Sequence, residues 1–145
     1  MIRGLEVETM VKHYEISGTD FANAGEASSK FKAMLKKLGV PGDVIRKVSI
    51  AMYEAEINTV IHGHGGTCDA EILSDRIEIT FKDCGPGIAD ISLAMQEGYS
   101  TATDKIRELG FGAGMGLPNI KKYTDDMKIE TEEGKGTTVI LTIKL

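Results

Sequence analysis

The chain has 145 residues, of which 41% are hydrophobic and 27% are charged, and its formal net charge at pH 7 is −5. These values are typical of one globular domain with a single core, so we expect residues 1–145 to form one domain. The acidic balance argues against a nucleic-acid surface. No segment approaches the roughly 20 apolar residues that span a bilayer. We therefore expect a cytoplasmic protein with neither nucleic acid nor membrane as a partner.

The first third of the chain predicts a strand followed by two helices. Apolar and polar residues partly alternate over 5–16, which favours a strand. Thr19 or Asp20 can cap the next segment, in which apolar residues recur at helical spacing until a glycine and a proline end it. Asp43 is then expected to cap a second helix over about 43–62.

Two hairpins and a third helix are expected in the rest of the chain, at residues 67–73, 76–82, 116–123, 128–131 and 137–145. The segment 84–116 is mostly irregular, with a short helical piece near 90–97, and long irregular segments in compact domains are usually functional or mobile. Strands in hairpins with helices between them predict an α+β fold, a two-layer sandwich. Its sheet would be mixed but mostly antiparallel, with the helices on one face.

The second predicted helix carries polar residues at a regular spacing. Glu54, Asn58 and His62 follow one another at intervals of four, so they share one helix face. The amide oxygen of Asn58 is a suitable ligand for Mg²⁺, and Glu54 could take a proton from an attacking hydroxyl or water. A solvated helix face explains the same pattern, and His62 also fits a partner of the last helix carbonyls.

A second polar motif follows a predicted strand. Asp83 comes directly after residues 76–82 and precedes Cys-Gly-Pro-Gly. A buried carboxylate needs a partner, and the exocyclic amine of adenine is one. Gly85 and Gly87 have no Cβ, so the backbone can pass close to a flat base. Asp-x-Gly-Pro-Gly is also strong turn chemistry, and that alternative stays open.

A third motif is the glycine run from Gly110 to Gly116, which leads into a helix. Backbone amides at such a helix start can bind an anion. The spacing is not that of a P-loop, and the run comes too late for a dinucleotide fold. Near the C-terminus, Thr137 in a Gly-Thr pair fits a hairpin, and it could also hydrogen-bond near a base held by Asp83.

Taken in order, these motifs resemble the N, G1, G2 and G3 boxes of the GHKL ATPases, and the resemblance covers about residues 43–145. That superfamily includes gyrase, the heat-shock chaperone ATPase, histidine kinases and the mismatch-repair ATPase. The resemblance implies the Bergerat fold, a histidine-kinase-like ATPase fold, and it implies ATP and Mg²⁺ as cofactors. A mobile lid over the nucleotide would span about 90–116.

The resemblance also implies a role for individual residues. Asn58 would hold Mg²⁺ and Glu54 would act as general base, while Asp83 would read adenine with Gly85 and Gly87 beside it. The remaining residues of the boxes would line the nucleotide, with the glycines at the phosphates and the threonine behind the base: Ile88, Gly110, Gly112, Gly114, Met115, Gly116, Leu117 and Thr137.

Within the superfamily the chain is similar to the serine kinases of bacterial partner-switching systems, namely anti-sigma factor kinases and the stressosome switch kinase. Glu54-Ala-Glu-Ile-Asn-Thr-Val-Ile-His-Gly and Gly114-Met-Gly-Leu-Pro-Asn-Ile-Lys-Lys carry this similarity. It implies a serine/threonine protein kinase that phosphorylates a STAS-domain antagonist protein and regulates a sigma factor or a PP2C-type phosphatase. Such relatives often form a homodimer, and the first strand and helix offer a surface for one.

Two other functions remain open. One is an ATP-gated module that binds a sigma factor or another partner without catalysis. The other is a detached ATP-binding domain of a histidine kinase. Gyrase-like and chaperone-like proteins are disfavoured, because we expect 145 residues to be too few for the additional domains that they need.

Overall fold

The structure is a computed structural model that describes residues 10–19, 22–85, 116–132 and 134–145. Its elements are β1 (Met10–Ser17), α1 (Glu26–Lys37), α2 (Gly42–Ile61), β2 (Gly65–Ile72), β3 (Arg76–Asp83), α5 (Gly116–Lys122), β4 (Asp126–Glu132) and β5 (Gly136–Lys144). In this part of the chain, no helix is both long enough and apolar enough to cross a membrane.

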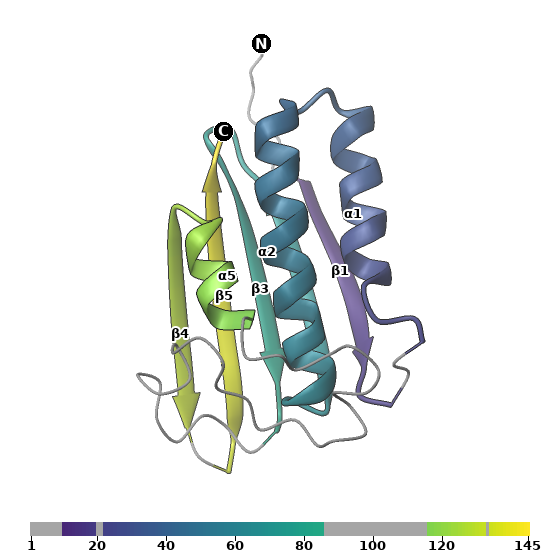
Figure 1. Ribbon diagram of the computed structural model, residues 1–145, viewed down its shortest axis with the longest axis vertical. Helices are drawn as coiled ribbons and strands as arrows, with labels where there is room; N and C mark the ends of the chain where they lie inside the picture. Colours follow the sequence, from purple (N-terminus) through teal and green to yellow (C-terminus); the bar gives the residue numbers. More distant parts are fainter. Residues whose placement is uncertain (1–9, 20–21, 86–115, 133) are drawn as a thin grey trace.

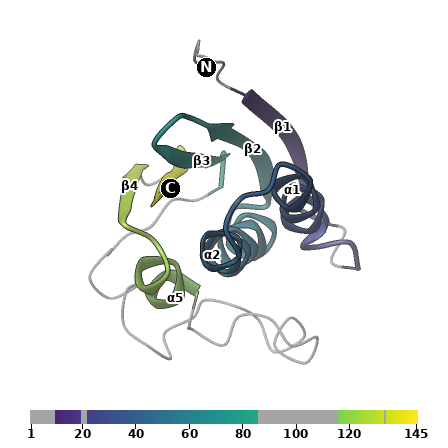
Figure 2. The same cartoon turned by 90° about the horizontal axis from the view of Figure 1, so that it is seen from above.

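The strands form one five-stranded sheet in the order β1-β2-β3-β5-β4. Every neighbouring pair among these strands is antiparallel. The helices cover one face of the sheet (Figure 1). Seen from above, α1 lies next to β1, α5 lies next to β4, and α2 lies between them (Figure 2). The predicted two-layer α+β sandwich is therefore confirmed, with an antiparallel rather than a mixed sheet among the described strands.

The central strand β3 shows why the sheet has one buried face. Ile77, Ile79 and Phe81 are buried, whereas Glu78 and Thr80 between them are half-exposed on the opposite face. The antiparallel register continues the buried face across the sheet, through the pairs Cys68–Phe81, Ala70–Ile79 and Ile79–Leu141. Burying each such Ile or Phe side chain contributes about 1.5–3 kcal/mol, so this face and the apolar side of α2 hold the two layers together.

Helix α1 begins later than the sequence predicts, α2 begins within one residue of its predicted start, and the predicted caps of both are wrong. The N-cap of α1 is Gly25, with a left-handed φ of 98° and no side-chain hydrogen bond, not Thr19 or Asp20. The N-cap of α2 is Pro41, again without a side-chain hydrogen bond. Asp43 lies instead in the first turn of α2, where a negative charge is favourable for the helix dipole.

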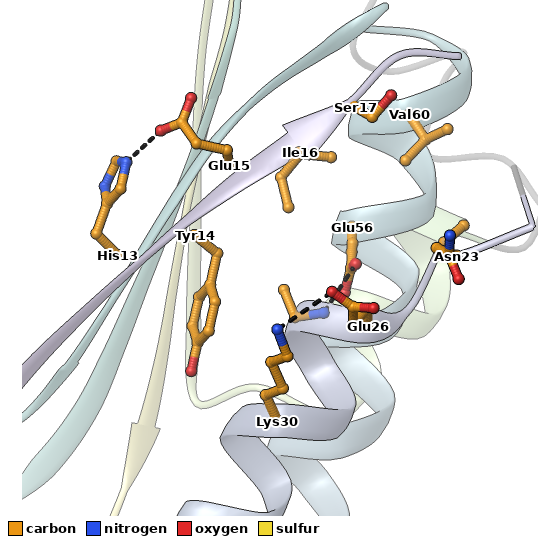
Figure 3. Close-up of a pocket in the computed structure, with 12 residues that line it drawn as sticks. His13, Tyr14, Glu15, Ile16, Ser17, Asn23, Glu26, Lys30, Glu56 and Val60 are labelled. Atoms are coloured by element: carbon orange, nitrogen blue, oxygen red, sulfur yellow. Dashed lines mark hydrogen bonds and ion pairs between the residues drawn. The ribbon is translucent and has the colours of Figure 1, made fainter. Parts of the chain in front are cut away.

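The first amides of α1 are bound by a side chain from α2. Oε2 of Glu56 accepts hydrogen bonds from the backbone N–H groups of Gly25 at 2.9 Å and Ala27 at 3.2 Å. Oε1 accepts from the N–H of Ser28 at 2.9 Å and from its hydroxyl at 2.6 Å. Glu56 is 3% exposed, and Figure 3 shows it beside the first turn of α1. A local cap is therefore not needed, because a tertiary contact binds the N–H groups that a helix start leaves unpaired.

Candidate functional site

The predicted site residues that the structure describes lie on elements that end close together. In Figure 1 the C-terminal ends of α2 and β3 and the start of β5 lie together at the lower end of the molecule. The antiparallel pairing of β3 with β5 aligns Lys82 with Thr138, so the next residue of β3, Asp83, lies at the start of β5. Residues from distant parts of the sequence therefore meet at one end of the sandwich.

Asp83 is held by backbone groups on two sides. Its Oδ1 accepts a hydrogen bond from the N–H of Gly85 at 3.0 Å and another from the N–H of Thr137 at 3.1 Å. The residue is half-buried, and no group in the described part of the chain donates a hydrogen bond to its Oδ2. One oxygen thus anchors the carboxylate, and the other can accept a hydrogen bond from an amine. The structure brings Asp83, Gly85 and Thr137 together, and their role toward adenine stays a prediction.

Thr137 contacts Asp83 through its backbone, not through its hydroxyl. The hydroxyl lies 3.0 Å from that of Thr131 on β4. The residue before it, Gly136, has a φ of 122°, and a Cβ there would lie 2.1 Å from the carbonyl oxygen of Asp83. Only glycine fits at that position. The Gly-Thr pair therefore supplies the close approach and the N–H that fix the aspartate.

Glu54 and Asn58 lie one turn apart on α2 and are both half-buried, so neither is on a fully solvated face. Burial raises the pKa of Glu54 above its usual range, and a hydrogen bond from the Asn119 side chain lowers it in part. Asn119 belongs to α5, which packs against α2. A carboxylate with a raised pKa is a better proton acceptor near neutral pH than an exposed one.

The residues at the end of α2 also fit a metal ion. Mg²⁺ is usually bound by one or two protein oxygens together with phosphate oxygens and water, and the amide oxygen of Asn58 is a ligand of this kind. The main-chain carbonyl of Asn58 accepts from the N–H groups of His62 at 2.8 Å and Gly63 at 3.2 Å. These bonds fix the helix turn, and the side chain of Asn58 would hold the ion.

Part of the predicted site lies outside the described residues. This applies to the predicted lid up to Gly116, and to Gly87, Ile88, Gly110, Gly112, Gly114 and Met115. Gly116 and Leu117 are the first residues of α5, so this helix starts where the sequence predicts. Leu117 packs against the hydrophobic core. The last glycine of the run, Gly116, is therefore part of the same helix as Asn119.

Three residues were not predicted from the sequence: Gly63 and Asn119, which contact the predicted site residues, and Glu56, which holds α1 against α2. Glu56 lies in the apolar stripe of α2, four residues from both Met52 and Val60. A charged residue at such a position indicates that buried groups bind its carboxylate. For Asn119 the signal is weaker, a polar residue in the first turn after a glycine run. Gly63 gives no signal, because its importance depends on what lies opposite it.

A cavity of about 310 Å³ lies apart from the predicted nucleotide residues, between β1, α1 and α2 (Figure 3). Its lining includes Tyr14, Lys30 and Glu56, and it includes none of the residues that the sequence predicts to bind nucleotide. The cavity borders the contact by which Glu56 binds α1. We therefore regard it as part of the packing between these elements.

The sandwich, the Glu-x-x-x-Asn helix and the strand-end aspartate beside Gly-Thr define a nucleotide-binding domain of the histidine-kinase type. The family model for the histidine kinase-like ATPase domain matches residues 19–143. The chain belongs to this family, and within it to the group of the anti-sigma F factors.

Two curated relatives show that the chain belongs to the anti-sigma F factor group. The anti-sigma F factor of Clostridium novyi (strain NT) is 32% identical over 119 residues, which are 78% of this chain and 80% of that protein. The anti-sigma F factor of Thermoanaerobacter sp. (strain X514) is 32% identical over 125 residues, 83% of this chain and 84% of that protein. The family resemblance seen in the sequence is confirmed.

A solved structure of another protein has the same fold. It contains the RsbU and RsbW domains of Rv1364c from Mycobacterium tuberculosis, and it matches with a TM-score of 0.64 at 17% identity. The match covers 94% of this chain but only 32% of that longer chain. At this level of identity the likeness concerns the fold alone.

Proposed function

We propose that the protein is a cytoplasmic serine/threonine protein kinase of a bacterial partner-switching system. ATP binding follows from its ATPase family. The proposal adds that the γ-phosphoryl group is transferred to a serine or threonine of a STAS-domain antagonist, and that the protein regulates a sigma factor or a PP2C-type phosphatase. The relatives named anti-sigma F factor support the partner class.

The observation that carries the proposal is the environment of Glu54. Its carboxyl group is half-buried, has a raised pKa, and lies one turn before Asn58 on the same helix. A module that only binds ATP has no need of a proton acceptor at this position. Asn119, from the helix that follows the glycine run, orients the carboxylate.

The residues support a direct phosphoryl transfer. The hydroxyl oxygen of the substrate would form a bond with the γ-phosphorus, and the bond from this phosphorus to the bridging oxygen would break, so that ADP leaves. Glu54 would take the hydroxyl proton. Mg²⁺, held by Asn58, would neutralise phosphate charge. Asp83 would fix the adenine end, so that the nucleotide is aligned between the two parts of the site.

The test is transfer of radiolabelled phosphate from ATP to a purified STAS-domain protein, with the wild type and with Glu54→Gln. We expect the variant to bind ATP as the wild type does and to lose transfer by about 10²–10⁴-fold, as for the loss of a general base. Glu130→Gln is a matched control, because Glu130 is an exposed residue of β4. It should transfer at the wild-type rate.

Two results would reject this proposal. Equal transfer by Glu54→Gln and the wild type would show that Glu54 is not the base. An acid-labile phosphohistidine on the product would favour the detached histidine-kinase domain instead. A phosphoserine that is stable in acid would exclude that alternative.

The names of the curated relatives favour one second candidate, an ATP-gated anti-sigma module without catalysis. It would bind its partner only in one nucleotide state. ATP-dependent capture of a sigma factor, with no phosphorylated antagonist under the conditions above, would support it.

A further inference from the structure

Gly63 lies against the side chain of Asp83. It follows the last turn of α2, and its N–H donates to the carbonyl oxygen of Asn58 at 3.2 Å. A Cβ at Gly63 would lie 2.5 Å from both Cγ and Oδ2 of Asp83 and 2.6 Å from its Cβ. Such distances are shorter than any ordinary contact. The aspartate can therefore occupy its position only because residue 63 has no side chain.

The carboxylate of Asp83 cannot move away from position 63 without weakening its hydrogen bonds. Its Oδ1 is bound by the N–H groups of Gly85 at 3.0 Å and Thr137 at 3.1 Å, and a shift would weaken both bonds. The backbones of residues 63 and 85 are also closely packed, because a Cβ at Gly85 would lie 2.9 Å from the Cα of Gly63. A side chain at position 63 would thus displace the carboxylate from its two amides.

The conformation of Gly63 does not itself require glycine. Gly65 and Gly136 have φ values of 95° and 122°, which disfavour any other residue, but Gly63 is not among the residues with positive φ. An alanine would fit its backbone. Only the approach of Asp83 excludes it, and this makes Gly63 an informative position to change.

We propose that Gly63 is a positioning residue for purine recognition and that it acts through Asp83. This inference rests on the proposed nucleotide site. With Gly63 in place, Oδ1 is anchored and Oδ2 is held where it can accept the exocyclic amine of adenine. Inosine triphosphate (ITP) presents a carbonyl oxygen at that position, which a carboxylate repels. The pair would therefore select adenine over 6-oxopurines, and it would connect the adenine end of the site to the helix turn of Asn58.

The test is the affinity for ATP and for ITP, measured by calorimetry with Mg²⁺ for the wild type, Gly63→Ala and Gly42→Ala. The wild type should prefer ATP by about tenfold or more, the value of one hydrogen bond to a charged group. Gly63→Ala should lose about tenfold in ATP affinity and little in ITP affinity, so its preference falls toward one. Gly42→Ala is the matched control, since its Cβ meets nothing within 4 Å.

The outcomes separate this inference from the proposed function. A wild type that binds no ATP would overturn both. A wild type that prefers ATP, together with a Gly63→Ala variant of unchanged affinity and preference, would overturn this inference alone. If Gly63→Ala lost the same factor of affinity for ATP and for ITP, its preference would be unchanged. That result would also overturn the inference, because the substitution would then weaken binding of both nucleotides and not recognition of the adenine amine.

A folding experiment covers the case in which Gly63→Ala is too unstable to bind. Asp83→Gly removes the three atoms that lie nearest to the new Cβ. Urea unfolding of the wild type, both single variants and the double variant gives a cycle. We expect Gly63→Ala to be less destabilising, or to regain folding, in the Asp83→Gly background. Additive losses would show that the two residues do not oppose each other.

Discussion

At the scale of single residues, the chemistry of the site depends on how Glu54 is held. Burial raises its pKa and the hydrogen bond from Asn119 lowers it, so the two effects oppose each other. The first keeps the carboxylate basic, and the second keeps it charged and oriented. A general base near neutral pH needs both properties. In the proposed reaction Asn119 would therefore act through Glu54.

Replacing Asn119 should move the pH dependence of phosphoryl transfer in a defined direction. Asn119→Ala removes a donor that favours the carboxylate, so the pKa of Glu54 rises. The base is active only when deprotonated, and the acid limb of the kcat profile should shift to higher pH. The measurement is kcat from pH 5 to 9 for the wild type and for both variants. Lys121→Ala, at an exposed position of the same helix, is the control. An acid limb that stays in place or shifts to lower pH would exclude the positioning role.

At the scale of secondary-structure elements, one side chain determines where α1 begins. Glu56 accepts hydrogen bonds from three backbone N–H groups and one hydroxyl at the start of that helix. The same helix α2 carries Glu54 two residues earlier, on another face. We therefore expect these two carboxylates, which are close in sequence, to have unrelated roles. Glu54 is the proposed base, whereas both oxygens of Glu56 accept hydrogen bonds inside the sandwich.

Removing this contact should destabilise the protein strongly. Glu56→Ala leaves buried N–H groups without an acceptor, and we expect the free energy of unfolding to fall by about 3 kcal/mol or more. Ser28→Ala removes only the hydroxyl bond and should cost about 1–2 kcal/mol. Glu26→Ala is the control, because Glu26 is exposed and forms a surface ion pair with Lys30. Urea unfolding measures all three. A loss below about 1 kcal/mol for Glu56→Ala would mean that α1 is held in another way.

These elements show which features the sequence predicts and which it does not. The alternation in β3 and the stripe in α2 predict the sheet and its covering helix, because both patterns are local. The cap of α1 could not be predicted, since its acceptor comes from a residue 28 positions later than Ser28. Asp83 and Thr137 could be placed at the ends of two strands, but the bond between their groups follows from the strand register. The need for glycine at position 63 could not be predicted, because it arises from the side chain of Asp83, which is distant in the sequence.

At the scale of the whole molecule, the antiparallel sheet places the nucleotide residues at one end. β3 and β5 meet there, and the last turn of α2 lies against them. α1 and β1 lie beside α2 on the other flank of the sandwich and carry none of the predicted nucleotide residues (Figure 2). A nucleotide bound at this end would contact the helix layer and the sheet together. Its binding energy should therefore stabilise the folded domain as a whole.

The stabilisation of the domain by ATP should depend on Asp83. At a hundred times its dissociation constant, ATP should add about 2.7 kcal/mol to the free energy of unfolding of the wild type. Asp83→Asn keeps an oxygen for the N–H groups of Gly85 and Thr137, so the unliganded variant should lose less than about 1 kcal/mol. Its amide NH₂ would face the amine of adenine, donor against donor, and the gain from ATP should disappear.

Thermal unfolding with and without Mg-ATP tests this directly. Asp126→Asn makes the same chemical change at an exposed residue of β4 and should keep the full shift. A full shift in Asp83→Asn would place adenine recognition elsewhere. Loss of the shift with unchanged unliganded stability would show that Asp83 contributes to binding without being needed for the fold. This separation is expected from the geometry, because only Oδ1 takes part in the fold and Oδ2 faces no donor among the described residues.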